Sequence, residues 1–102
     1  MSAPTDSASA AIAIEGQQGL GEAIALHRLV DQHLRAGRDV VLDFSTAEFV
    51  GSAAMQTFVA CARDAGDQGR KLRFVSVPPR IVDDFTLMGL GAWFEPFLRE
   101  RD

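Results

Sequence analysis

The side chains of this chain that could carry out chemistry are two histidines, one cysteine and a serine that opens a helical pattern. Ser52 is not part of a G-x-S-x-G sequence, and His27 and His33 both fall in one earlier helical segment, so no Ser-His-Asp hydrolase is predicted. The histidines are six residues apart, which does not fit a metal site with i, i+4 spacing. We interpret His27, on the apolar side of its helix, as a core or rim histidine.

The single cysteine, Cys61, has no partner for an intramolecular disulfide and no thiolate companion for a zinc site. It falls among Met55, Phe58 and Ala62 on the apolar face of a second helical segment. That position is typical of an inert core thiol, and a lone thiol agrees with a reducing compartment.

Phosphate and magnesium sites are not indicated either. Gly16, Gly19 and Gly21 follow an apolar segment, but they match neither the P-loop nor the G-x-G-x-x-G pattern. Asp43 and Glu48 are the acids nearest the second helix, and two carboxylates alone do not make a convincing Mg²⁺ site. We therefore predict no catalytic residue, no metal and no cofactor.

Composition predicts one compact domain. The chain has 102 residues, of which 47% are apolar and 24% charged, and its net charge is -4. No predicted helix or strand carries a cluster of Lys and Arg, which argues against nucleic acid as a partner. No apolar run approaches the roughly 20 residues that span a bilayer, so we expect a cytoplasmic chain without membrane insertion. Residues 1–10 are small and polar and predict a flexible tail, which leaves residues 11–102 as the domain.

The apolar spacing alternates between strand and helix patterns along the chain. We expect strands over 11–16, 39–44 and 72–77, helices over 20–36, 52–65 and 80–88, a loop over 45–48, and a closing segment over 92–98 that is either an edge strand or a short helix. The continuous apolar run 39–44 predicts a strand buried on both faces. This order predicts an α/β fold: a small, mostly parallel or mixed sheet of four to five strands with helices packed against it.

Ser52 directly follows a buried strand and a loop and opens the second helix. Its hydroxyl either caps free backbone N–H groups of the first turn or carries a phosphate, which the positive end of the helix would accommodate. The exposed side of this helix is either a partner-binding face or a plain solvated face. The predicted partner-binding residues are Gly51, Ser52, Ala53, Gln56, Val59, Ala60 and Arg63.

The stretch V-L-D-F-S-T-A-E-F-V-G-S-A-A-M, from Val41 to Met55, resembles the STAS domain, the fold of bacterial anti-sigma factor antagonists. It is similar to the family's apolar strand, its D-x-S turn and its F-[MV]-D-S-[ST]-G-L signature. The run from Gly69 to Leu90 resembles the family's next strand, helix and small-residue-Gly-Leu turn, so the resemblance covers about residues 11–97. Gly51 stands where the signature has Asp, Ser52 matches its Ser, Ala53 replaces its second Ser or Thr, and Ala54 replaces its Gly.

The resemblance implies that Ser52 is the serine phosphorylated by a partner anti-sigma kinase, and that the unphosphorylated form binds this partner. We expect a non-enzymatic partner-switching protein that regulates transcription in this way. The alternatives are a STAS scaffold in a chemotaxis or receptor signalling cluster, without phosphorylation, and the cytoplasmic STAS subunit of a phospholipid-transport ABC complex. In each case the expected partner is a protein.

The C-terminal part of the chain is rich in large apolar residues. They either close the core or form a homodimer patch, so we expect a monomer or a weak homodimer. The residues concerned are Phe85, Leu90, Trp93, Phe94 and Phe97.

Overall fold

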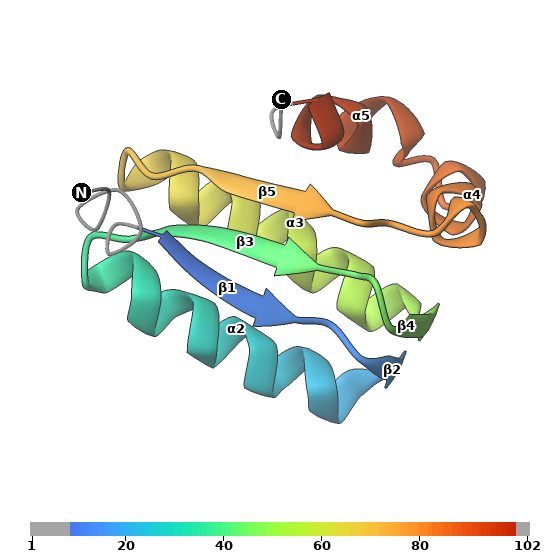
Figure 1. Cartoon of the computed structure of the whole chain (residues 1–102), viewed down its shortest axis with the longest axis horizontal. Coiled ribbons are helices and arrows are strands. Elements are labelled where there is room, and N and C mark those ends of the chain that lie inside the picture. The colour runs from blue at the N-terminus through green and yellow to red at the C-terminus, as the bar shows by residue number, and fades with distance from the viewer. Residues whose placement is uncertain (1–8, 100–102) are drawn as a thin grey trace.

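The computed structural model describes residues 9–99 and has the predicted α/β architecture (Figure 1). The strands are β1 (Ser9–Ala13), β2 (Gly16–Gln18), β3 (Asp39–Asp43), β4 (Ala47–Val50) and β5 (Leu72–Val75). The helices are α2 (Leu20–Arg35), α3 (Ser52–Asp67), α4 (Pro79–Leu87) and α5 (Gly91–Arg99). No helix within residues 9–99 is long and apolar enough to cross a membrane.

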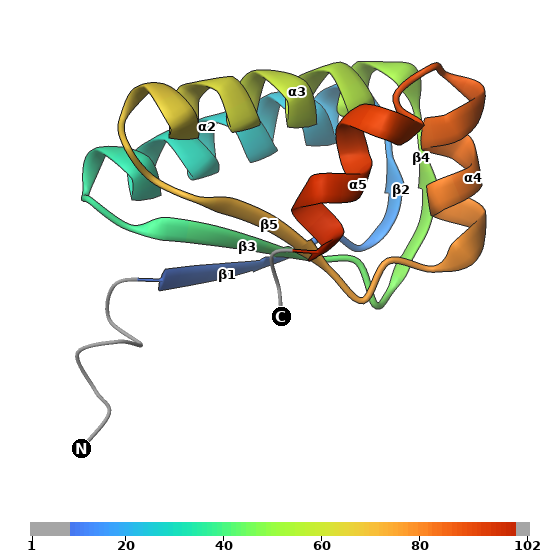
Figure 2. The ribbon, with the colours of Figure 1, turned by 90° about the horizontal axis from the view of Figure 1, so that it is seen from above.

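The strands form two small parallel sheets instead of one continuous sheet. The larger sheet has the order β1-β3-β5, and β2 pairs with β4 in the smaller one. Parallel neighbours need a crossover connection, and α2 and α3 supply these crossovers. Both helices lie on the same side of the larger sheet (Figure 2).

The core lies between this sheet and the helices, and aromatic rings fill much of it. Phe44, Phe58 and Phe74 meet edge to face or tilted, with ring centroids 5.4 to 5.8 Å apart. Phe85 of α4 and Phe94 of α5 complete the cluster, and all five rings are at most 1% exposed. Such buried rings dominate the energetics of a small core.

The closing segment is a helix, α5, and it covers the core. Trp93 and Phe97 lie against Phe74, with ring centroids at 6.2 and 5.4 Å. Leu90, Trp93 and Phe97 are partly buried, and Phe85 and Phe94 are fully buried. The C-terminal apolar residues therefore serve the core and do not form an exposed patch.

Four local predictions differ from the structure. The loop predicted over 45–48 is shorter, because residues 47–50 form β4 by pairing with β2. Ser9 and Ala10 pair with β3 and belong to β1 instead of the tail, whose residues 1–8 lie outside the described part of the chain. Strand β3 is not buried on both faces, since its side chains alternate between buried and half-buried. The helical spacing of residues 80–88 predicts that Met88 is buried together with Ile81 and Phe85, but Met88 lies at the end of α4 and is 49% exposed.

Candidate docking site at the start of helix α3

Helix α3 begins at Ser52, as predicted, but Gly51 and not Ser52 occupies its N-cap position. Gly51 is extended, with φ -78° and ψ 170°, and its carbonyl accepts the first helical bond from Met55 N at 3.0 Å. No side chain caps this end of the helix. The interpretation of Ser52 as a cap is therefore wrong. Ser52 is the first residue of the helix, and its side chain is exposed beside backbone N–H groups that no side chain caps.

Backbone pairing with β2 fixes where this helix starts. Gln18 pairs with Val50, and the Gly51 N–H donates to the Gln18 carbonyl at 3.0 Å. The buried side chain of Gln18 donates in turn to the carbonyl of Glu15 at 2.8 Å. A Cβ atom at position 51 would lie 3.3 Å from the Gln18 carbonyl oxygen, so Gly51 permits a close approach of two backbones.

Two adjoining hollows flank Ser52. The larger, about 420 Å³, runs along α3 to the turn after α4 and is lined by Ser52, Met55, Gln56, Val59, Ala60, Arg63, Met88 and Leu90. The smaller, about 200 Å³, lies between β4, the start of α3 and α4 and is lined by Phe49, Val50, Gly51, Ser52, Met55, Asp84, Leu87 and Met88. Ser52 lines both and therefore stands at their junction.

The structure brings most of the predicted partner-binding residues together. Ser52, Gln56, Val59, Ala60 and Arg63 all line the larger hollow. Gly51 lines the smaller one, and Ala53 lines neither.

Sequence reasoning missed the apolar rim. Phe49, Leu87 and Met88 are 53%, 84% and 49% exposed, and all three line the smaller hollow. We call these three residues the apolar rim. Leu87 was the available signal, because it lies about 200° around the helix from Phe85 and therefore away from the face that buries Ile81 and Phe85. The rim is also assembled from segments far apart in the chain, which periodicity alone does not reveal.

The candidate docking site, formed by the two hollows around Ser52, carries charges of both signs. Arg63, at one end of the larger hollow, is exposed and makes no ion pair with any residue of the described part of the chain. Asp84 lies in the smaller hollow, near the positive end of α3. A complementary surface would therefore present apolar side chains together with an acidic group for Arg63.

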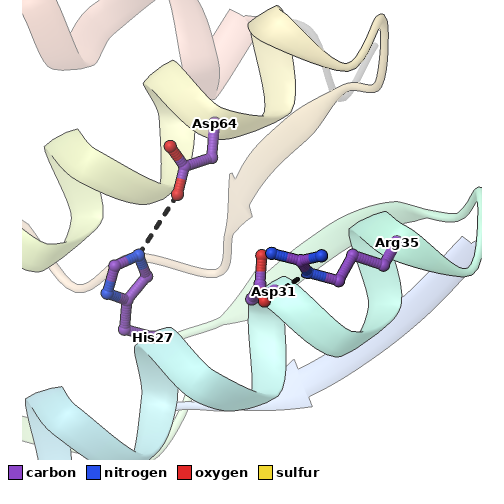
Figure 3. A network of polar contacts seen from close by, with 4 residues as sticks. All are labelled: His27, Asp31, Arg35 and Asp64. Atoms are coloured by element: carbon purple, nitrogen blue, oxygen red, sulfur yellow. Dashed lines mark hydrogen bonds and ion pairs between the residues drawn. The ribbon is translucent and has the colours of Figure 1, made fainter.

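The histidines lie elsewhere, on helix α2. Nε2 of His27 lies 3.2 Å from Oδ2 of Asp64 on α3 (Figure 3). On α2 itself, Nε of Arg35 donates a hydrogen bond to Oδ2 of Asp31. His27 is thus a rim histidine that bridges two helices. It lines a third hollow, of about 510 Å³, together with Asp31, Arg35 and Asp64, and Ser52 is not part of that lining.

Cys61, Asp43 and Glu48 are the remaining residues that the sequence analysis considered for chemistry. Cys61 is fully buried, and this burial, followed by the nearby carboxylates of Asp64 and Asp31, raises the pKa of its thiol to about 12. Asp43 accepts a hydrogen bond from Ser45 N at 2.9 Å, and Glu48 is exposed on β4. Within residues 9–99, no group of three or more His, Cys, Asp or Glu side chains is placed to hold a metal.

Comparison with known proteins identifies the family. A family model described as "Mlab, STAS domain" matches residues 1–99, so the chain belongs to the STAS domain family, as the sequence resemblance predicted. No curated protein sequence gives a significant match.

Solved structures agree on the fold. The chain is similar to the anti-sigma factor antagonist SpoIIAA in its unphosphorylated form, with TM-score 0.71 and 15% identity, over 83% of this chain and 76% of that one. It is also similar to part of Mglu, with TM-score 0.62 and 17% identity, over 71% of this chain and 18% of that one. At these identities the likeness establishes the fold alone.

Proposed function

We propose that this chain is a non-enzymatic partner-switching protein of the cytoplasm. The start of α3 docks on a protein partner, an anti-sigma-type serine kinase, and phosphorylation of Ser52 ends the contact. The observation that carries the proposal is the position of Ser52, exposed at the junction of two hollows beside the apolar rim. The likeness to an anti-sigma factor antagonist supports it.

Docking is driven by the apolar rim. Large apolar side chains that remain exposed around a hollow gain free energy when a partner removes them from water. Arg63, at the edge of the same site, gives the contact its orientation, because a rim charge selects partners of complementary charge.

Phosphorylation acts on the same few residues. A phosphate on Ser52 adds about -1.5 to -2 charges at the junction of the hollows, and the free N–H groups of the first turn of α3 hold it there. A partner would then have to remove water from a doubly charged group beside Asp84 and the apolar rim. That desolvation cost, together with repulsion of any acidic group aimed at Arg63, weakens binding.

Intact-mass analysis with phosphosite mapping tests the switch, on protein recovered from its native cells under growth and under stress. The proposal predicts a single phosphate on Ser52 that is absent from Ser52→Ala. A photo-crosslinking residue at Leu87, in the apolar rim, should attach to an ATP-binding kinase, while the same residue at Leu29 on α2 should not. A kinase attached equally from both positions would contradict the docking site.

Gly51 favours a second candidate, constitutive docking without phosphorylation. The signature Asp is absent, and the close approach of Gly51 to the Gln18 carbonyl gives this glycine a structural reason. The chain would then act as a scaffold in a receptor signalling cluster, or the same docking site would bind the ATPase of a transport complex. A chain that is never phosphorylated, but whose Leu87 position crosslinks to a protein other than a kinase, would support this candidate.

A further inference from the structure

The larger sheet has one face that no described helix covers. Helices α2 and α3 lie on the other side (Figure 2). Along β1, β3 and β5 the buried residues alternate with exposed or half-buried ones, so every second side chain points to the open face. Its apolar members are Ala11, Ala13, Val41 and Val75. Parallel sheets are almost always covered on both faces, so this open face is unusual.

Charges on the open face are sorted by strand. Asp39 and Asp43 alternate with Val41 on β3. Arg73 of β5 points the same way, because its two neighbours Leu72 and Phe74 are buried, and so does Lys71, which directly precedes Leu72. Neither cation forms an ion pair with a residue of the described range 9–99. One strand is therefore acidic on this face and its neighbour is basic.

The register of the sheet sets the level of each charge, by which we mean its position along the strand direction. Val41 lies beside Arg73, and Asp43 lies beside Val75. The Lys71 N–H donates to Oδ1 of Asp39 at 3.0 Å, which places Lys71 level with Asp39. Along the strand direction, Arg73 is thus midway between the levels of Asp39 and Asp43.

We propose that the open face binds a second copy of this chain. A two-fold axis parallel to the strands and between β3 and β5 would lay β5 of each copy over β3 of the other. Such a rotation keeps every residue at its own level. Lys71 would then face Asp39 of the second copy, and Arg73 would lie over Val41 between the two carboxylates. The face is thus complementary to itself, as a two-fold interface requires.

The dimer is weak and reversible. The axis brings only β3 and β5 into contact; strands rise about 3.3 Å per residue and lie about 4.8 Å apart, so the overlapping face measures roughly 16 by 10 Å. A stable interface buries about 800 Å² on each partner, and this face is much smaller, so the dimer it forms is weak. We expect a dissociation constant on the order of 100 µM, which sedimentation velocity and light scattering detect at high protein concentration.

Charge reversal and mixing test the arrangement. Arg73→Glu alone and Asp43→Arg alone each place like charges across the axis in both halves of a homodimer, and each should raise the dissociation constant at least about tenfold. An equal mixture of the two variants should form a heterodimer. In one half of that heterodimer the introduced carboxylate at position 73 faces the introduced guanidinium at position 43, and the other half keeps the original pair. Arg28→Glu on α2, which lies on the other side of the sheet, makes the same charge change away from the open face and should leave dimerisation unchanged.

Folding of each variant is checked by circular dichroism, since Asp43 also bonds the loop at Ser45. If Asp43→Arg does not fold, Val41→Arg replaces it in the mixture, because position 41 lies directly opposite position 73 of the second copy. A chain that stays monomeric up to about 1 mM overturns the proposal. So does a dimer that Arg73→Glu does not weaken, or a mixture that does not associate. The Ser52 site plays no part in any of these outcomes.

Discussion

Phe85 and Phe94 stack face to face, with ring centroids 3.9 Å apart and planes 3° from parallel. This contact joins α4 to α5, and both rings also lie near Phe74 of β5. The last helix is therefore attached to the sheet through the aromatic core. Because the turn after α4 supplies Met88 and Leu90 to the larger hollow, the same contact holds one wall of that hollow in place.

Removing one ring of this stack should destabilise the whole fold. We expect Phe94→Ala to lower the free energy of unfolding by about 3 to 5 kcal/mol, because it deletes a fully buried aromatic side chain and leaves a cavity. Urea denaturation followed by circular dichroism measures the change. Leu87→Ala is the matched control: this side chain is mostly exposed, and we expect a change within about 0.5 kcal/mol. Equal effects of the two substitutions would refute the assignment of α5 to the core.

The contact between His27 and Asp64 should contribute little to stability, although it links two helices. The two side chains are 48% and 39% exposed, and an exposed ion pair contributes about 0 to 1 kcal/mol. A double-mutant cycle with His27→Ala and Asp64→Ala measures the coupling free energy. A value of about 2 kcal/mol or more would show a stronger link between α2 and α3 than this geometry allows.

Cys61 should make stability fall at high pH. The pKa of its thiol is about 12 in the folded chain, against a normal value of 9.0, so the unfolded chain releases this proton first as pH rises. The contribution is complete below pH 9.0 and is lost as pH approaches about 12. Within that window the wild type should lose about 1.4 kcal/mol per pH unit more than Cys61→Ala. Parallel slopes for the two proteins in urea titrations would contradict the shift.

Alkylation gives an independent measure of the same thiol. Iodoacetamide reacts with the thiolate, so native protein in mildly alkaline buffer should stay unmodified for hours, and protein in urea should react within minutes. Mass spectrometry follows the reaction. Rapid modification of the folded chain would show that Cys61 is accessible.

Restoring the signature Asp should change stability only slightly. At the N-cap an Asp side chain can accept a first-turn N–H, a gain of a few tenths of a kcal/mol over Gly. Its Cβ would meet the Gln18 carbonyl oxygen at 3.3 Å, which offsets part of that gain. We expect Gly51→Asp to shift the free energy of unfolding by less than about 1 kcal/mol, with Gly51→Ala as the control for the Cβ atom alone. A much larger loss would mean that the backbones at Gly51 and Gln18 cannot separate.

Sequence patterns predicted the elements that depend on local periodicity. Helix α3 begins at Ser52 as expected, and Met55, Phe58 and Cys61 lie on its buried face as expected. These residues follow one another at helical spacing, so the pattern contains the information. The family resemblance then pointed to the start of the same helix as the candidate functional face.

Features that depend on tertiary pairing were not predictable in this way. β4 exists because Gln17 and Gln18 pair with Phe49 and Val50, and neither segment looks like a strand by itself. The apolar rim combines β4 with the end of α4, which approach one another only in the folded chain. One face of β3 is half-exposed because both crossover helices lie on the other side of the sheet. A continuous apolar run does not specify on which side those helices pack.

The hydrogen bond from Gly51 to Gln18 joins two main-chain groups. The position of Ser52 therefore depends on peptide atoms that every residue type except proline provides, and not on the identity of a recognition side chain. Mutation can replace the charged residue in front of the serine while the helix still begins at the same point. The chemistry directly in front of the serine can therefore change while the backbone that presents the serine stays the same.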